Sequence, residues 1–126
     1  MEKQVFNSTK GPKARGPYSS ATILGNLVFV SGQGPIDPET DQFVGETVEE
    51  QTRRVLENIK IILEELGSSL DKVLKCNVYL ADMNDFQKMN SVYAEFFPQN
   101  PPARTTVQAG RLPFDIKVEI ECVASL

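Results

Sequence analysis

The run from Leu27 to Val30 (LVFV) places the strongest constraint on how this chain can fold. Successive residues of a strand point to opposite faces of a sheet, so a strand of consecutive apolar residues has no polar face. Both of its faces must therefore be covered. A turn signal, Gly25-Asn26, separates this run from a second apolar stretch at residues 21–24, which predicts a hairpin.

Two later segments have the pattern of helices. Thr47 and Glu50 form a capping box, in which each side chain bonds to the backbone amide of the other residue. Apolar residues at helical spacing follow as far as Gly67, which ends the run: Val48, Val55, Ile59, Ile62, Leu63 and Leu66. Asp82 is placed to cap a second helix, which Pro98 stops. Its inner stripe is expected to contain Phe86, Met89, Tyr93, Phe96 and Phe97.

Four further segments are predicted to be strands, at residues 4–6, 73–80, 104–108 and 116–124. The last of these alternates clearly between apolar and mainly polar positions. Its core face is predicted to carry Ile116, Val118, Ile120, Cys122 and Ala124. In the segment 73–80, the core face is predicted to carry Leu74, Cys76, Val78 and Leu80.

About six strands and two helices predict a single α+β domain over residues 1–126, with both helices on one face of the sheet. Two helices can cover only one face. The apolar strand at residues 27–30 then needs other cover, and a second copy of the chain is the simplest source. We therefore expect a homo-oligomer.

Composition argues against several classes of function. The net charge is −4, histidine is absent and no basic stripe is present, so nucleic acid is not expected as a partner. The missing histidines also exclude the usual zinc patterns and a Ser-His or Cys-His nucleophile. Lys10, Lys13 and Arg15 are interpreted as a solvated loop rather than a binding patch.

Other short patterns also receive ordinary interpretations. The acidic segment 37–41 is taken as a turn, because Gln42 and Val48 stand where a calcium loop needs glycine and glutamate. Cys76 and Cys122 are expected to pack as small apolar residues. No apolar run is long enough for a membrane span, and no signal peptide is recognised. A cytoplasmic location is expected.

Several short motifs together resemble the RidA (YjgF) family. They occur in the family's order over residues 16–124: Gly16-Pro17-Tyr18-Ser19, Val30-Ser31-Gly32-Gln33, Asn84-Asp85-Phe86, Pro102-Ala103-Arg104, Arg111-Leu112-Pro113 and Val118-Glu119-Ile120. The resemblance implies a chorismate-mutase-like subunit with a mixed sheet, and a homotrimer with sites in the clefts between subunits. It also implies hydrolysis of 2-iminobutanoate and 2-iminopropanoate to 2-keto acids and ammonia, which protects against damage by these reactive compounds. No cofactor or metal is expected.

The resemblance assigns roles to three catalytic candidates. Arg104 matches the family's substrate arginine, and its guanidinium offers paired donors to a carboxylate. Glu119 is the candidate base for the attacking water. Glu121 faces the same side of the predicted strand, but only Glu119 falls in the motif Val118-Glu119-Ile120 that resembles the family. Tyr18 is expected to bound the pocket. From their positions alone, Arg104 would be a surface ion-pair residue and Glu119 a solvated one.

Four further residues are candidates for substrate binding. Ser31 and Gly32 follow the apolar strand, where glycine lets backbone come close to a ligand. Asn90 lies on the second helix and is placed at the cleft or the neighbouring subunit. Thr106 stands where many family members carry cysteine, so any property that depends on that thiol is absent here.

Two other functions remain as alternatives. The first is a non-catalytic, regulatory module that binds small carboxylates, for which Arg104 would suffice and Glu119 would be dispensable. The second is an endoribonuclease or translation inhibitor. The acidic net charge and the absence of histidine count against the second alternative.

Overall fold

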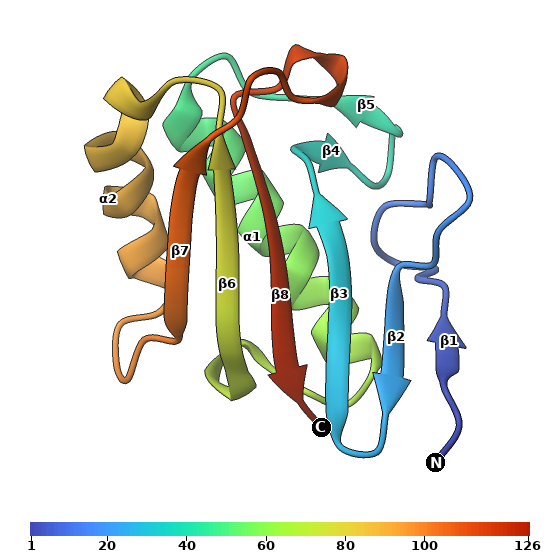
Figure 1. The fold of residues 1–126 in the computed structure, drawn as a ribbon. Helices are drawn as coiled ribbons and strands as arrows, with labels where there is room; N and C mark the ends of the chain where they lie inside the picture. Colours follow the sequence, from blue (N-terminus) through green and yellow to red (C-terminus); the bar gives the residue numbers. More distant parts are fainter.

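The computed structural model describes residues 1–126 and consists of a six-stranded sheet with two helices packed against one face (Figure 1). The strand order is β1-β2-β3-β8-β6-β7. The strands are β1 (Gln4–Phe6), β2 (Ala21–Leu24), β3 (Leu27–Gln33), β6 (Val73–Leu80), β7 (Ala103–Gln108) and β8 (Val118–Ser125). Every neighbouring pair is antiparallel except β6 and β7, which run parallel. The predicted mixed sheet is confirmed.

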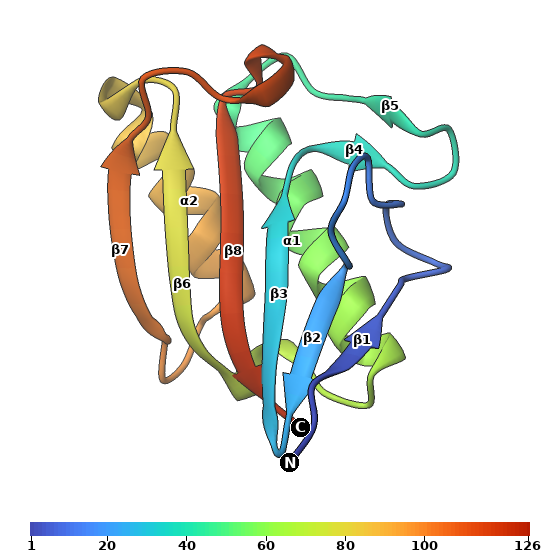
Figure 2. The ribbon, with the colours of Figure 1, turned by 45° about the vertical axis from the view of Figure 1, so that its right-hand side comes forward.

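The apolar strand β3 has one buried and one open face. Val28 and Val30 are 0% and 4% exposed beneath the helices, whereas Leu27 and Phe29 on the other face are 40% and 44% exposed. Both helices lie on the same side of the sheet (Figure 2), so no element of this chain covers the second face. The prediction that one face needs an outside partner therefore still applies.

Helix α1 (Val48–Glu65) begins and ends where the sequence predicts. The capping box of Thr47 and Glu50 is formed, and Gly67 follows the helix with a φ of +81°, a conformation that favours glycine. All the predicted core positions of this helix are buried except Leu66, which is partly exposed.

Helix α2 (Phe86–Phe96) differs slightly from the prediction. Asp82 does cap a helical turn, but the turn is a short 3-10 helix, Met83–Asp85, that precedes α2. Met89, Tyr93 and Phe97 are buried as expected, and Val92 joins them.

One prediction about the sheet is wrong. Leu74 was assigned to the core face of β6, yet it is 51% exposed while Val73 is buried. The pairing of β6 with β8 shifts register between Val73 and Lys75, so Leu74 is displaced from the alternation that resumes at Cys76. The predicted alternation of β8 is confirmed throughout.

The end of the sheet next to β4 and β5 is built from several short elements. β4 (Ile36–Asp37) and β5 (Gln42–Phe43) form a hairpin whose connection is the turn predicted for the acidic segment. The buried Asn58 of α1 donates to the Gly34 and Ile36 carbonyl oxygens at 3.2 and 2.8 Å, so the helix holds this hairpin in place. No helix is both long enough and apolar enough to cross a membrane.

Candidate functional site

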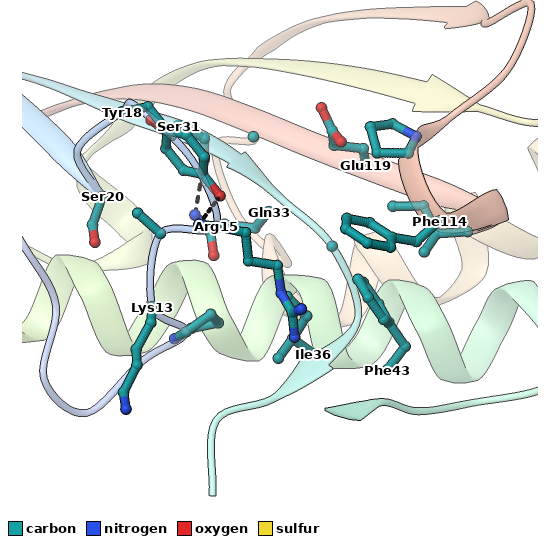
Figure 3. Close-up of a pocket in the computed structure, with 16 residues that line it drawn as sticks. Lys13, Arg15, Tyr18, Ser20, Ser31, Gln33, Ile36, Phe43, Phe114 and Glu119 are labelled. Atoms are coloured by element: carbon teal, nitrogen blue, oxygen red, sulfur yellow. Dashed lines mark hydrogen bonds between the residues drawn. The ribbon is translucent and has the colours of Figure 1, made fainter. Parts of the chain in front are cut away.

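A pocket of about 390 Å³ opens at this end of the sheet (Figure 3). Its walls are the loop at residues 12–18, the end of β3, the β4–β5 hairpin and the turn that contains Phe114. Four of the seven predicted site residues line it: Tyr18, Ser31, Gly32 and Glu119. The loop, β3 and β8 are distant in sequence, so the pocket is a product of the tertiary fold.

Glu119 supplies the only carboxylate of this pocket. It lies on β8, on the sheet face opposite the helices, and is partly buried. Its carboxylate has no hydrogen-bond or ion-pair partner in the chain. Burial raises the pKa of Glu119, and repulsion from the neighbouring Glu121 raises it further. A free carboxylate with a raised pKa is suited to accept a proton from water near neutral pH.

Gly32 lies directly against that carboxylate. A Cβ at residue 32 would sit 2.5 Å from Oε2 of Glu119, closer than real Cβ contacts allow. Glycine at this position therefore leaves space for the Glu119 carboxylate.

Ser31 and Tyr18 have visible structural roles. The Ser31 hydroxyl donates to the Ser19 carbonyl oxygen at 2.7 Å, and its amide donates to the Ser20 carbonyl oxygen at 3.0 Å. Tyr18 is 47% exposed, and its hydroxyl accepts a hydrogen bond from the Arg15 amide at 3.0 Å. These bonds hold the loop at residues 12–18 over the pocket.

The structure adds residues that the sequence analysis missed. Lys13 and Arg15 lie in an exposed loop, as the solvated-loop interpretation expects, and they also line the pocket. The Arg15 guanidinium lies 4.9 Å from the ring centroid of Phe43 and 5.5 Å from that of Phe114. The two rings contact each other, with centroids 4.8 Å apart. Nothing local in the sequence connects these three positions.

The other predicted site residues form a second group on β7 and α2. The Arg104 guanidinium lies over the ring of Tyr93 at 4.7 Å and near that of Phe86 at 5.5 Å. Three buried polar atoms of this group have no hydrogen-bond partner: Asn90 Oδ1, Tyr93 Oη and Thr106 Oγ1. Such unpaired buried polar atoms are rare in proteins, and each calls for a structural explanation.

The two groups do not meet within one chain. Arg104 is in register with Cys76 and through it with Cys122, two residues whose side chains are buried on the helix side of the sheet. Glu119 is in register with Tyr79 on the opposite face. Arg104 and Glu119 therefore point to different faces of the sheet, with β6 between their strands.

The two cysteines belong to the core, as predicted. Cys76 and Cys122 are register partners on β6 and β8 and are 0% and 3% exposed. Burial raises the pKa of both thiols, which keeps them protonated.

Comparison with known proteins places these features in a family context. The model of the family described as Endoribonuclease L-PSP matches residues 8–126. A RutC family protein of Pyrococcus abyssi is 54% identical over 98% of both chains. The chloroplastic Reactive Intermediate Deaminase A of Arabidopsis thaliana is 46% identical over 100% of this chain and 67% of its own length. The crystal structure of E. coli TdcF with bound serine has a TM-score of 0.92 at 39% identity and covers 98% of both chains.

Proposed function

Because the chain belongs to the Endoribonuclease L-PSP family, the YjgF/RidA family that its motifs resemble, we propose that it hydrolyses 2-imino acids to 2-keto acids and ammonia. Its expected substrates are 2-iminobutanoate and 2-iminopropanoate. One relative carries the name of a reactive intermediate deaminase, and another was solved with serine, an amino acid with a similar carboxylate and nitrogen. The observation that carries the proposal is the partly buried, unpaired Glu119 carboxylate against Gly32.

The proposed reaction begins with the attack of water on the carbon of the protonated imine. As the C–O bond forms, Glu119 takes a proton from the water and a neutral carbinolamine results. Glu119 then returns this proton to the nitrogen. The C–N bond breaks to release ammonia, and the carbonyl forms as the hydroxyl proton leaves with ammonia as ammonium. General base assistance of this kind is typically worth about 10²- to 10⁴-fold in rate.

The substrate carboxylate is assigned to Arg104, and this assignment requires a neighbouring subunit. Arg104 and Glu119 lie on opposite faces of the sheet, so an Arg104 from one chain has to reach the Glu119 of the next. Arg104 lies on the edge strand β7 and is only partly buried, so a neighbouring chain can reach it. The open apolar face of β3 supports the same assembly. We propose a homotrimer with a site between each pair of neighbours.

Subunit complementation tests this arrangement. Arg104→Ala and Glu119→Gln are each expected to abolish the acceleration of imine hydrolysis, measured as ammonia released from 2-iminobutanoate made in situ. In randomly mixed oligomers of the two variants, about a quarter of the sites regain both native residues, so activity should return to roughly that level. Native mass spectrometry of differently tagged variants verifies that the subunits have mixed.

The other outcomes of this experiment are equally informative. Mixed oligomers that stay inactive would contradict a site shared between chains. A wild-type protein that does not accelerate hydrolysis over buffer would overturn the enzymatic proposal. If Glu119→Gln bound 2-ketobutanoate normally and no turnover were found in the wild type, the chain would instead be a binding module for small carboxylates.

The family description names ribonuclease activity, and RNA cleavage is the natural counter-test. The chain has a net charge of −4 and no histidine, so it lacks both a basic groove and the commonest proton-transfer group of ribonucleases. Purified protein that cleaves RNA only while Glu119 is intact would contradict the preference for imine chemistry.

A further inference from the structure

We propose that Arg15 recognises a second carboxylate on the substrate, and that this chain therefore favours 2-imino acids with an acidic side chain. This inference rests on the proposed function. It assigns the wall opposite Glu119 to the side chain of the substrate, whereas Arg104 of the neighbouring subunit keeps the carboxylate next to the imine.

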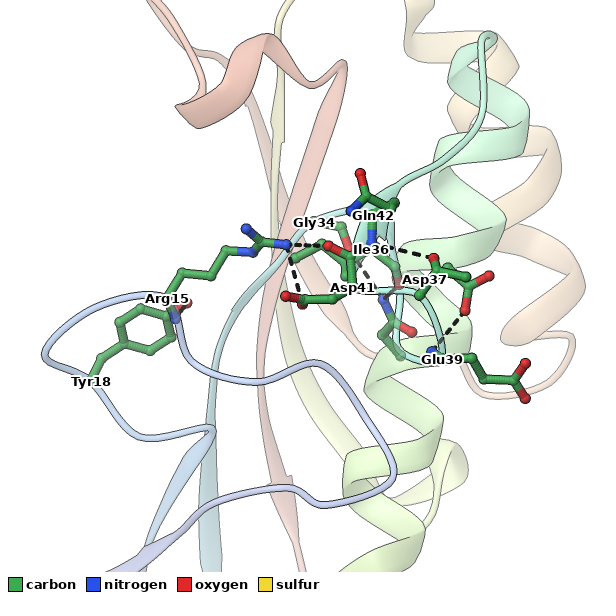
Figure 4. Close-up of polar contacts among 10 residues, drawn as sticks. Arg15, Tyr18, Gly34, Ile36, Asp37, Glu39, Asp41 and Gln42 are labelled. Atoms are coloured by element: carbon green, nitrogen blue, oxygen red, sulfur yellow. Dashed lines mark hydrogen bonds and ion pairs between the residues drawn. The ribbon is translucent and has the colours of Figure 1, made fainter.

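The guanidinium of Arg15 is held in a fixed position at the pocket wall. Nη2 donates to the Asp41 carbonyl oxygen at 2.7 Å and to Oδ1 of the same residue at 3.2 Å (Figure 4). The rings of Phe43 and Phe114, which contact each other, both lie near the cation. Contacts with aromatic faces and a carboxylate restrict this long side chain before any ligand binds.

The restrained guanidinium still has donors to offer. Nε and Nη1 of Arg15 make no hydrogen bond within the chain, while Nη2 alone serves Asp41. The side chain of Arg15 is 28% exposed, against 56% for that of Asp41, so the carboxylate faces solvent more than the cation does. These donors are therefore available to an incoming anion.

Positive and negative groups lie in different parts of the pocket. Arg15 and Lys13 contribute positive charges to the lining, with Asp41 paired to Arg15, and Glu119 contributes a negative charge. In Figure 3 the Arg15 guanidinium lies beside Ile36 and Phe43, whereas Glu119 lies beyond Phe114. Both residues line the same pocket, so we expect the side chain of a substrate whose imine lies at Glu119 to extend past Phe114 toward Arg15.

An aliphatic side chain on the substrate would leave the free donors of Arg15 without hydrogen-bond partners. It would shield the free donors of Arg15 from water without replacing the lost hydrogen bonds, which is unfavourable. A side-chain carboxylate would pair with them instead. Sites that offer hydrogen bonds discriminate strongly against ligands that lack the matching group, although partial exposure of Arg15 reduces the effect.

The test compares two classes of imine made in situ by amino acid oxidases, with catalase present to remove peroxide. The acidic imines are those formed from aspartate and glutamate, and the neutral one is formed from alanine. Wild-type protein is expected to show kcat/KM about tenfold higher for the acidic class. Arg15→Gln should lower kcat/KM for acidic imines about tenfold, mainly through KM, and leave the neutral imine within about twofold.

Matched variants separate recognition from folding. Arg53 is the matched control, because it lies on α1 and does not line the pocket. Its guanidinium pairs with the carboxylate of Glu95 and lies near the ring of Phe96. Arg53→Gln should leave the ratio of the two substrate classes unchanged. Arg15→Lys should restore part of the preference because it returns the charge without the planar donors.

Binding of the products gives a readout that does not depend on turnover. Titration calorimetry should show tighter binding of 2-ketoglutarate than of 2-ketobutanoate, and Arg15→Gln should remove the difference. Suppose that the neutral imine is hydrolysed, but Arg15→Gln changes neither the kcat/KM preference for acidic imines nor the tighter binding of 2-ketoglutarate. The assignment of Arg15 is then wrong, and the proposed function stands. If no imine is hydrolysed faster than in buffer, both fall.

Discussion

Gly32 and Glu119 lie against each other in the candidate site, and they come from strands far apart in the sequence. Glu119 gains its raised pKa from burial and from Glu121, and Gly32 leaves the room in which that carboxylate lies. The alternation of side chains along β8 predicts which face of the sheet Glu119 occupies. Its contact with Gly32 arises because β3 and β8 are neighbours in the sheet.

Substitution of Gly32 tests the need for this contact. Gly32→Ala places a Cβ 2.5 Å from Oε2, so the Glu119 carboxylate has to move. We expect kcat for imine hydrolysis to fall at least about tenfold, because small misplacements of a catalytic group are costly. Gly110→Ala is the matched control, since a Cβ there meets nothing within 4 Å. Equal activity of the two variants would contradict the role of Gly32.

The pH dependence of activity tests Glu119 as the base. The acid must be ionised to accept a proton, so kcat/KM should fall as the pH drops through its raised pKa. Glu121→Gln removes the neighbouring negative charge, which lowers the pKa of Glu119 and should move this acidic limb to lower pH. A limb that does not move in Glu121→Gln would show that another group controls it.

Helix α1 organises the loops around the pocket as well as the core. Its Asn58 holds the β4 segment, and its Gln51 donates to the Gly45 carbonyl oxygen and accepts from the Lys117 amide. At the other end of the helix, Glu65 accepts hydrogen bonds from Ser8, from the amide and hydroxyl of Thr9 and from the Lys10 amide. One helix thus anchors both the β4–β5 hairpin and the chain that leads into the loop at residues 12–18.

Glu65→Gln tests the anchoring of the N-terminal segment. Partial burial raises the pKa of Glu65, but the donors of Ser8, Thr9 and Lys10 outweigh it and hold the pKa below its ordinary value. The ionised acid therefore stabilises the fold above the unfolded pKa, and this stability is lost as the pH falls through the lower, folded pKa.

We expect Glu65→Gln to reduce the free energy of unfolding by about 1 kcal/mol at neutral pH, measured by urea denaturation. The difference from wild type should shrink below about pH 4, where the unfolded acid becomes protonated. Glu64→Gln, on the exposed neighbouring residue, is the control and should have little effect. A difference that persisted in acid would rule out the ionised carboxylate as its source.

For the whole molecule, the open face of the sheet is the main feature that one chain leaves unsatisfied. Val5, Leu27, Phe29 and Val107 are between 40% and 59% exposed there. Monomeric proteins rarely expose large apolar patches, so this face is the expected contact between copies.

Phe29→Lys should break the assembly, because a lysine opposite apolar residues at an interface loses its hydration without gaining a partner. Sedimentation velocity is expected to show smaller species, together with loss of imine hydrolysis. Val44→Lys introduces the same charge at a residue of similar exposure beside the β4–β5 hairpin and should leave the assembly intact. A wild-type protein that sediments as a monomer at micromolar concentration would overturn the proposed trimer.

Most of the secondary structure could be predicted because its signals lie within a few residues of one another. The Thr47–Glu50 capping box begins α1, and alternation defines the buried face of β8. Leu74 was assigned wrongly because the register shift at that point depends on the partner strand. The site was predicted in part: motif resemblance selected Glu119 and Gly32, which do meet, but could not show that Arg104 faces the other side of the sheet.

Local chain chemistry was therefore enough to establish the α+β class, the boundaries of α1 and the apolar strand β3, for which an outside partner is expected. Periodicity and capping depend on neighbours in the sequence, and neighbours can be read directly. Only the tertiary structure decided two other sets of contacts. It brings Arg15 to the rings of Phe43 and Phe114, and Glu65 to residues 8–10. Such contacts join segments that approach each other only after the sheet and α1 have packed together, so no local sequence pattern predicts them.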